Sequence, residues 1–217
     1  MQDTFFLKNP EFGYLPRDEI VSKVKKVHEK GDYGSTGWGY EWDEKTAKKN
    51  VMRTHTTALS AITLAKTNLD NLPLKFFNVG KVYRNETMDW SHLFEFYQTE
   101  GIVIGEVNFR HLLGYLKEFF GKMGYEKVRF RPAFFPYTSN STEIEVYLQD
   151  RKQWIELGGA GIFRPEVVMP LLGKDIPVLA WGLGLERIVT PYYNITDLRE
   201  IYGNDLKQLR TIKNWLK

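Results

Sequence analysis

The segment VGKVYRNETMDWSHLFEFYQTEG, residues 79–101, decides the fold. Apolar and polar residues alternate on both sides of a polar stretch at 87–94, and this alternation is typical of half-buried β-strands. The two runs are KFFNVGKVYRNE (75–86) and FEFYQTEGIVIG (94–105). The sequence therefore predicts two strands that pair as a hairpin around a polar loop.

Charged and amide side chains share one face of this hairpin. Successive side chains on a strand point to opposite faces, so Arg84 goes with Glu86, and Phe96 goes with Gln98 and Glu100. One interpretation is a solvated outer face with surface ion pairs, each contributing ~0–1 kcal/mol. The other is a site for a ligand that carries both an anion and an ammonium group, because arginine binds phosphate or carboxylate and the acid and amide bind an amine. Neighbouring strand residues are aromatic or glycine, which favours the second interpretation.

Four further strands and several helices are predicted outside the hairpin. The strands are KVRFRPAFF (127–135), TEIEVYLQD (142–150), KQWIELGG (152–159) and IPVLAWGLG (176–184). Helices are predicted over 17–31 with Asp18 as a possible cap, 54–69, 107–124, from 185 onward, and across the tail at 196–217. The strands outnumber the helices and tend to follow one another directly. This order predicts an α+β fold in which helices flank an antiparallel sheet.

Composition excludes several classes of function. The 217 residues include no cysteine, so disulfides, thiolate nucleophiles and thiolate zinc sites are excluded. No apolar run approaches the ~20 residues that span a bilayer, and the first residues do not resemble a signal peptide. A net charge of +3 permits contact with a polyanion without arguing for one. We expect a cytoplasmic protein with no membrane contact.

Six short segments resemble one family. FFNVGKVYRNE (76–86) resembles motif 2 of class II aminoacyl-tRNA synthetases, and GLGLER (182–187) resembles motif 3. The other four segments are RTHTT (53–57), FEFYQTEG (94–101), FRPAFFPYT (130–138) and GIFRPE (161–166). Together they resemble the catalytic core of phenylalanyl-tRNA synthetase alpha subunits of the archaeal and eukaryotic type, from about residue 2 to 200.

The resemblance implies ATP-dependent activation of L-phenylalanine, followed by transfer to tRNA(Phe). It implies that Arg84 binds the α-phosphate of ATP and Arg187 the γ-phosphate. It places Glu86 and His92 on the adenine and phosphate side, and it makes Glu156 a partner of ATP or Mg²⁺. A glutamate at this position can also pair with a local cation, and His92 can be a solvated loop residue.

The resemblance also implies a phenylalanine pocket. The residues that would contact the amino group are Gln98, Thr99 and Glu100, with His55 and Thr57 nearby. The residues that would surround the ring are Phe135, Tyr137, Phe163 and Ala180. His55 can alternatively cap the following helix, and the aromatic residues can alternatively be core residues.

The resemblance further implies a partner subunit, and this sequence departs from the pattern of the family at two places. Family members are heterotetramers of two alpha and two beta subunits, in which editing belongs to the beta subunit. Many relatives carry Glu-Pro where Ser139 and Asn140 stand here, so this position supplies no glutamate for Mg²⁺. The chain starts just after the place of motif 1. We therefore expect one catalytic core, residues 1–217, truncated on its N-terminal side, which self-associates or is poorly soluble and is weakly active or inactive alone.

Two other functions remain open. A phosphoseryl-tRNA synthetase would share this architecture, but it would need basic or hydroxyl groups in the side-chain pocket, where FFPY and GIFRP offer aromatic residues. A non-catalytic paralogue would keep the fold and bind ATP or phenylalanine without acylating tRNA. Pyrophosphate exchange with phenylalanine separates these possibilities.

Overall fold

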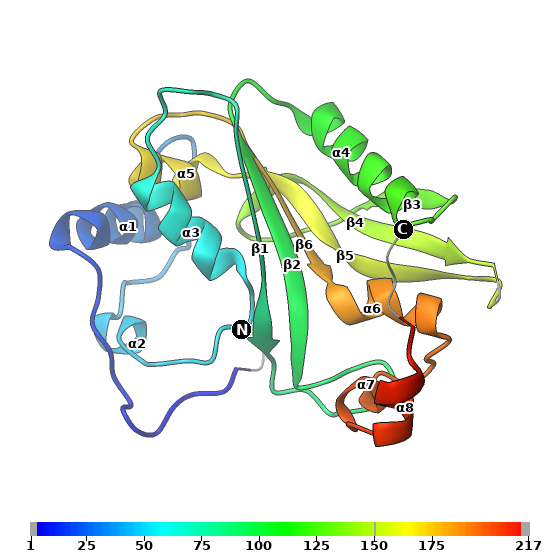
Figure 1. The fold of residues 1–217 in the computed structure, drawn as a ribbon. Helices are drawn as coiled ribbons and strands as arrows, with labels where there is room; N and C mark the ends of the chain where they lie inside the picture. Colours follow the sequence, from blue (N-terminus) through cyan, green and yellow to red (C-terminus); the bar gives the residue numbers. More distant parts are fainter. Residues whose placement is uncertain (1–3, 150, 214–217) are drawn as a thin grey trace.

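A computed structural model describes residues 4–149 and 151–213. Its centre is a six-stranded antiparallel sheet with the order β1-β2-β6-β5-β4-β3 (Figure 1). The strands are β1 (Leu74–Tyr83), β2 (Glu95–Ile104), β3 (Val128–Pro132), β4 (Thr138–Leu148), β5 (Gln153–Phe163) and β6 (Val178–Gly184). The predicted α+β class and antiparallel sheet are confirmed.

Helices follow or separate the strands as expected, with some differences. They are α1 (Asp18–Lys30), α2 (Glu44–Ala47), α3 (Thr57–Lys66), α4 (Phe109–Lys122), α5 (Pro165–Leu172), α6 (Leu185–Val189), η1 (Thr190–Tyr193), α7 (Arg199–Tyr202) and α8 (Leu206–Thr211). Asp18 is not a cap: Arg17 occupies the N-cap position, and Asp18 lies in the first turn. The predicted tail helix is two short helices separated by residues 203–205, and residues 214–217 lie outside the described part.

The predicted hairpin is formed by β1 and β2. Val82 pairs with Phe96 and Gly80 pairs with Gln98, so the even-numbered side chains of both strands share a face. β1 ends at Tyr83, and Arg84 therefore begins the loop, although its amide still donates to the carbonyl of Phe94 at 2.9 Å. The hairpin thus places Arg84 just beyond the end of β1, where the loop begins.

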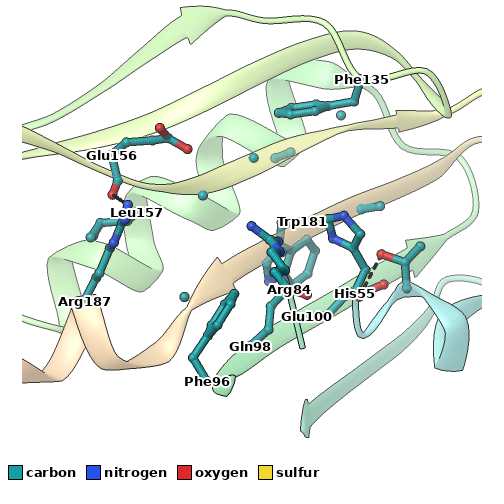
Figure 2. A pocket seen from close by; sticks show the side chains of 18 of the residues that line it. His55, Arg84, Phe96, Gln98, Glu100, Phe135, Glu156, Leu157, Trp181 and Arg187 are labelled. Atoms are coloured by element: carbon teal, nitrogen blue, oxygen red, sulfur yellow. Dashed lines mark hydrogen bonds between the residues drawn. The ribbon is translucent and has the colours of Figure 1, made fainter. Parts of the chain in front are cut away.

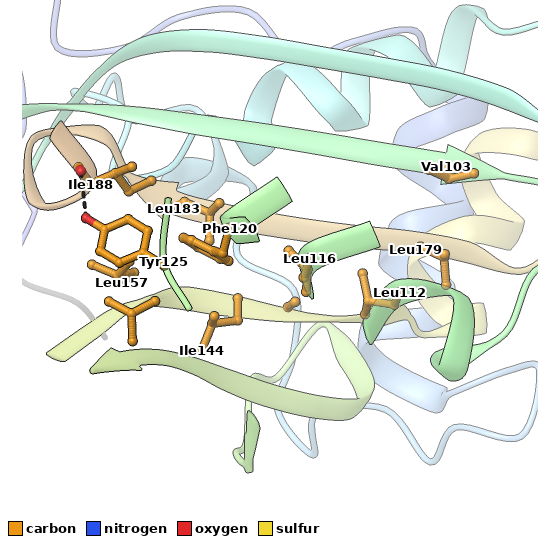
Figure 3. Packing of buried hydrophobic residues seen from close by; sticks show 12 residues of the cluster. Val103, Leu112, Leu116, Phe120, Tyr125, Ile144, Leu157, Leu179, Leu183 and Ile188 are labelled. Carbon is orange, nitrogen blue, oxygen red and sulfur yellow. Dashed lines mark hydrogen bonds between the residues drawn. The ribbon is translucent and has the colours of Figure 1, made fainter. Parts of the chain in front are cut away.

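Helix α4 covers one face of the sheet. Leu112, Leu116 and Phe120 recur at steps of four residues and are fully buried against strand residues such as Leu179 and Leu183 (Figure 3). Burying each such side chain contributes about 1.5–3 kcal/mol. The side chain of Asn108 caps the helix by accepting from the amides of Arg110 and His111, in a capping box.

The opposite face is only partly covered. Ile102 and Ala180 alternate with the residues that face α4, and they pack with Leu64 of α3 and Val168 of α5. These two helices lie at one end of the sheet (Figure 1). The remainder of this face is left for a cavity. Among the described residues, no helix is long and apolar enough to cross a membrane.

Candidate active site

A cavity of about 550 Å³ opens on the face opposite α4. Residues from α3, the β1–β2 hairpin, β4, β5, β6 and α6 meet there (Figure 2). The predicted site residues that line it are His55, Thr57, Arg84, Glu86, His92, Gln98, Glu100, Phe135, Tyr137, Glu156, Phe163, Ala180 and Arg187. They come from segments as far apart in sequence as residues 55 and 187, so the fold gathers them at one place.

Thr99 is the exception among the predicted site residues. It lies between Gln98 and Glu100 on β2, so its side chain points to the opposite face of the sheet. It does not line the cavity. The contact between Thr99 and phenylalanine stays a prediction, which strand alternation disfavours for the side chain.

Glu100 is a buried acid surrounded by hydroxyl groups. Its side chain is 2% exposed, and its Oε2 accepts from the hydroxyls of Thr56 at 2.7 Å and Thr57 at 3.1 Å. The hydroxyl of Ser60 donates to Oε1. Burial raises the pKa of Glu100, and these hydroxyl bonds offset only part of that effect. The carboxylate lies at the N-terminus of α3, whose dipole favours negative charge.

Gln98 is oriented by the same helix start. Its Oε1 accepts from the amide of Thr56 at 3.0 Å and from the hydroxyl of Thr56 at 3.1 Å. Sequence reasoning missed both Thr56 and Ser60. Helical spacing offered a signal, because residues 56, 57 and 60 lie on one side of a helix start.

Aromatic rings form the wall at β4 and β5. Phe135 and Tyr137 are stacked with centroids 6.3 Å apart, and Tyr137 meets Phe163 edge-on at 6.4 Å. His55 also meets the Tyr137 ring edge-on, at 6.3 Å. Gly159 lies beneath Phe135, and a Cβ atom there would overlap the ring. Glycine is therefore required for the ring to lie close to the strand.

Two arginines lie at the other end of the cavity. Arg84 donates to the carbonyl of Thr54 at 3.3 Å, and burial lowers its pKa. Arg187 donates to the carbonyls of Ser91 at 3.2 Å and Glu156 at 3.3 Å. Within residues 4–149 and 151–213, neither guanidinium has an ion pair with a carboxylate. Their charges are therefore available to an anionic ligand.

The β1–β2 loop is ordered by Asp89. Its carboxylate accepts from the amides of Ser91 at 2.7 Å and His92 at 2.8 Å, and these bonds lower its pKa. The His92 ring lies 3.0 Å from Asp89 Oδ1. His92 and Glu86 thus reach the cavity from a turn with internal hydrogen bonds.

Glu156 lies on β5 near Arg187 and stays exposed. Partial desolvation and the nearby Glu143 raise its pKa. The described residues contain no group of three or more acids or histidines that could hold a metal ion. Glu156 and the nearby Glu143 are fewer than three such groups, so a metal here would need further ligands from a bound molecule.

Comparisons with known proteins point to one family. Residues 1–212 match the family described as tRNA synthetases class II core domain (F). The chain is similar to phenylalanine–tRNA ligase alpha subunits of Methanopyrus kandleri (56% identity over 212 residues, 96% of this chain) and Dictyostelium discoideum (45% over 217 residues, 99%). The matched regions make up 40% and 44% of those relatives, so the chain spans less than half their length.

A solved structure shares the fold. Pyrrolysyl-tRNA synthetase from Desulfitobacterium hafniense superposes with a TM-score of 0.54 at 17% identity, covering 72% of this chain and 55% of that one. This likeness concerns the arrangement of the sheet and its helices alone.

Proposed function

The chain belongs to the class II tRNA synthetase core family, and on that premise we propose that it is the catalytic domain of a phenylalanine–tRNA ligase alpha subunit. It would activate L-phenylalanine with ATP and pass the acyl group to tRNA(Phe). The observation that carries the proposal is a single cavity holding an acid–amide pair, an aromatic wall and two arginines without carboxylate partners among the described residues.

The acid–amide end suits the amino group of the substrate. Glu100 retains an acceptor lone pair beside the hydroxyls of Thr56, Thr57 and Ser60. Gln98 Oε1 already accepts from the amide and hydroxyl of Thr56, so Glu100 is the acceptor for the ammonium ion. An ammonium ion supplies the donors and the positive charge that a buried carboxylate lacks. The aromatic wall then receives the phenyl ring through edge-on contacts.

The arginine end suits the triphosphate. The phenylalanine carboxylate oxygen attacks the α-phosphorus, the bond from that phosphorus to the bridging oxygen breaks, and pyrophosphate leaves with both bonding electrons. No protein nucleophile is needed, so Arg84 and Arg187 act by positioning the phosphates and neutralising their charge. Mg²⁺ bound with ATP would add charge neutralisation, with Glu156 as its protein ligand and phosphate oxygens as further ligands.

The side-chain pocket argues against a phosphorylated substrate. Phe135 and Phe163 offer ring carbons where a phosphate would need several cations or hydroxyls, and the Tyr137 hydroxyl is the one such group that these three side chains supply. An apolar pocket rejects the added hydroxyl of tyrosine by a limited factor, on the order of 100-fold. Editing by a partner would therefore be useful.

The proposed partners follow from the names of the relatives, which are alpha subunits. We propose a beta-subunit partner, assembly as two alpha and two beta subunits, tRNA(Phe) as acyl acceptor and a cytoplasmic location. We further propose that this chain forms one catalytic domain within a longer subunit.

Pyrophosphate exchange tests the proposal. The chain is assayed with ATP and radiolabelled pyrophosphate, alone and with the beta subunit added, using L-phenylalanine and phosphoserine as substrates. We expect exchange that depends on phenylalanine and rises when the beta subunit is present. Binding of ATP and phenylalanine without exchange in either preparation would favour the non-catalytic paralogue and overturn the enzymatic assignment.

A further inference from the structure

Glu186 is a buried acid that the proposed chemistry does not use. It lies in the first turn of α6 and is 5% exposed. Among the described residues it has no ion pair, although acids are seldom buried unless they are paired. Its Oε1 instead accepts two hydrogen bonds, from the amide of Tyr97 at 2.6 Å and from the hydroxyl of Tyr202. Burial and the bond to Glu186 raise the pKa of Tyr202, so its hydroxyl remains a donor.

The two hydrogen bonds connect the chain segments that carry Arg84 and Arg187, at the end of the cavity proposed to bind the nucleotide. Tyr97 directly follows Phe96, whose ring lies under Arg84, and Glu186 directly precedes Arg187. One carboxylate therefore fixes the distance between the chain segments that carry Arg84 with Phe96 and Arg187. Figure 2 shows Phe96 beside Arg84, and Arg187 apart from them beside Glu156.

The segment around α7 supports the same region from outside. The amide of Leu198 donates to the carbonyl of Trp90 at 2.9 Å, and Leu198 itself lines the cavity. Tyr202, four residues later, reaches Glu186. The β1–β2 loop is thus held between α7 and Arg187, which contacts the carbonyl of Ser91.

We propose that Glu186, together with the Tyr202 hydroxyl, is a positioning pair that sets the spacing of the Phe96–Arg84 and Arg187 walls and thereby determines the affinity for a nucleoside triphosphate. The inference rests on the proposed function for the identity of the ligand. A merely structural pair would change stability or the affinity for both substrates. A positioning pair at this end changes the affinity for ATP and leaves the affinity for phenylalanine unchanged.

Calorimetric titration of the chain with ATP, and separately with L-phenylalanine, tests this difference. Tyr202→Phe removes one hydrogen bond to a buried acid, so the dissociation constant for ATP should rise about tenfold. The constant for phenylalanine should stay within about twofold of the wild type. The matched control is Tyr125→Phe, because the Tyr125 hydroxyl donates to the carbonyl of Ile188 at 2.8 Å on the core side of the same helix. This control should lower the unfolding midpoint and leave both constants unchanged.

A second pair of variants decides the matter if Tyr202→Phe does not fold. Glu186→Gln keeps an acceptor oxygen and should bind ATP within about threefold of the wild type, whereas Glu186→Leu should bind at least about tenfold more weakly. The inference would be overturned if a variant lost affinity equally for ATP and for phenylalanine. It would also be overturned if folded Tyr202→Phe kept the wild-type dissociation constant for ATP. A wild-type chain that binds neither ligand would instead refute the proposed function.

Discussion

The guanidinium of Arg84 lies over the ring of Phe96, with its central carbon 5.1 Å from the ring centroid. The two residues belong to the two arms of one hairpin, and the pairing of Val82 with Phe96 brings them together. The ring holds the cation in place without neutralising it, since a cation–π contact leaves the N–H donors available. The arginine is therefore oriented for an anion before any anion arrives.

Replacing Arg84 by alanine should reduce phenylalanine-dependent pyrophosphate exchange at least about 100-fold, because one preorganised charged donor at a reacting phosphate has this order of effect. The domain should stay folded, since the side chain makes one long bond to the carbonyl of Thr54. Arg110→Ala, on the exposed surface of α4, is the control and should retain wild-type exchange. A folded Arg84→Ala protein with full activity would remove the motif 2 assignment.

Ala180→Gly should enlarge the amino-acid pocket. The Ala180 side chain is 6% exposed and packs with Phe163, and one methyl group in an apolar pocket changes discrimination by about 1–3 kcal/mol. We expect exchange with para-chlorophenylalanine to rise at least about tenfold relative to phenylalanine. Val146→Ala removes apolar volume from the core beneath α4, at a residue that does not line the cavity, and should lower stability without changing this ratio. An unchanged ratio in Ala180→Gly would place Ala180 outside the pocket.

Gly159→Ala should displace the Phe135 ring into the space for the substrate, because the added Cβ overlaps that ring. The affinity for phenylalanine should fall about tenfold while the affinity for ATP is retained, since overpacking costs of ~1–3 kcal/mol are typical. Gly121→Ala has open space around its Cβ and serves as the control. Both constants are measured by calorimetry, and equal phenylalanine affinities in the two variants would contradict the role of Phe135.

An exposed apolar strand predicts self-association. β1 is the outermost described strand on its side of the sheet, and it exposes Phe77 by 82% and Val79 by 51%. Such an edge is a template for pairing with another chain. Phe77→Lys should therefore lower the apparent mass in sedimentation velocity, whereas Phe134→Lys should not, although Phe134 is 77% exposed on a loop. A wild-type chain that sediments as a monomer at all concentrations would contradict this prediction.

Local patterns in the sequence predicted the parts of the fold that depend on short-range periodicity. Alternation gave the hairpin of β1 and β2, and the spacing of Leu112, Leu116 and Phe120 gave α4. The tail pattern predicted one helix, but the helix breaks after Gly203, where Asn204 takes a left-handed conformation with a φ of 52°.

Site residues could be predicted where they belong to a sequence motif. They could not be predicted where only a contact between distant segments brings them to the site. Arg84 and Arg187 stand in recognisable motifs, whereas Ser60 reaches Glu100 across 40 residues of sequence. Glu186 was likewise missed, since nothing in GLGLER distinguishes a buried acid from an exposed one before Tyr97 and Tyr202 are placed around it. Thr99 is the reverse case, because it belongs to a matched segment while strand alternation directs its side chain to the other face of the sheet.

Phenylalanine binding should depend on the protonation of Glu100. Burial raises the pKa of this acid above the ordinary value of 4.5, and an ammonium ligand needs the ionised form, so affinity should fall as pH drops through the raised pKa. The free energy of unfolding of the ligand-free chain should change in the opposite sense. Glu100 keeps its proton to a higher pH in the folded state than in the unfolded chain, so the free energy of unfolding falls as pH rises from the unfolded pKa to the raised pKa.

His55 does not account for a step above pH 5, because burial and Arg84 lower its pKa to about 4. Ser60→Ala removes a donor to the carboxylate, so the midpoint for phenylalanine binding should lie at higher pH in this variant than in the wild-type chain. Calorimetry from pH 5 to 8 measures both, and a midpoint that stays fixed in Ser60→Ala but disappears in His55→Gln would assign the titration to the histidine instead.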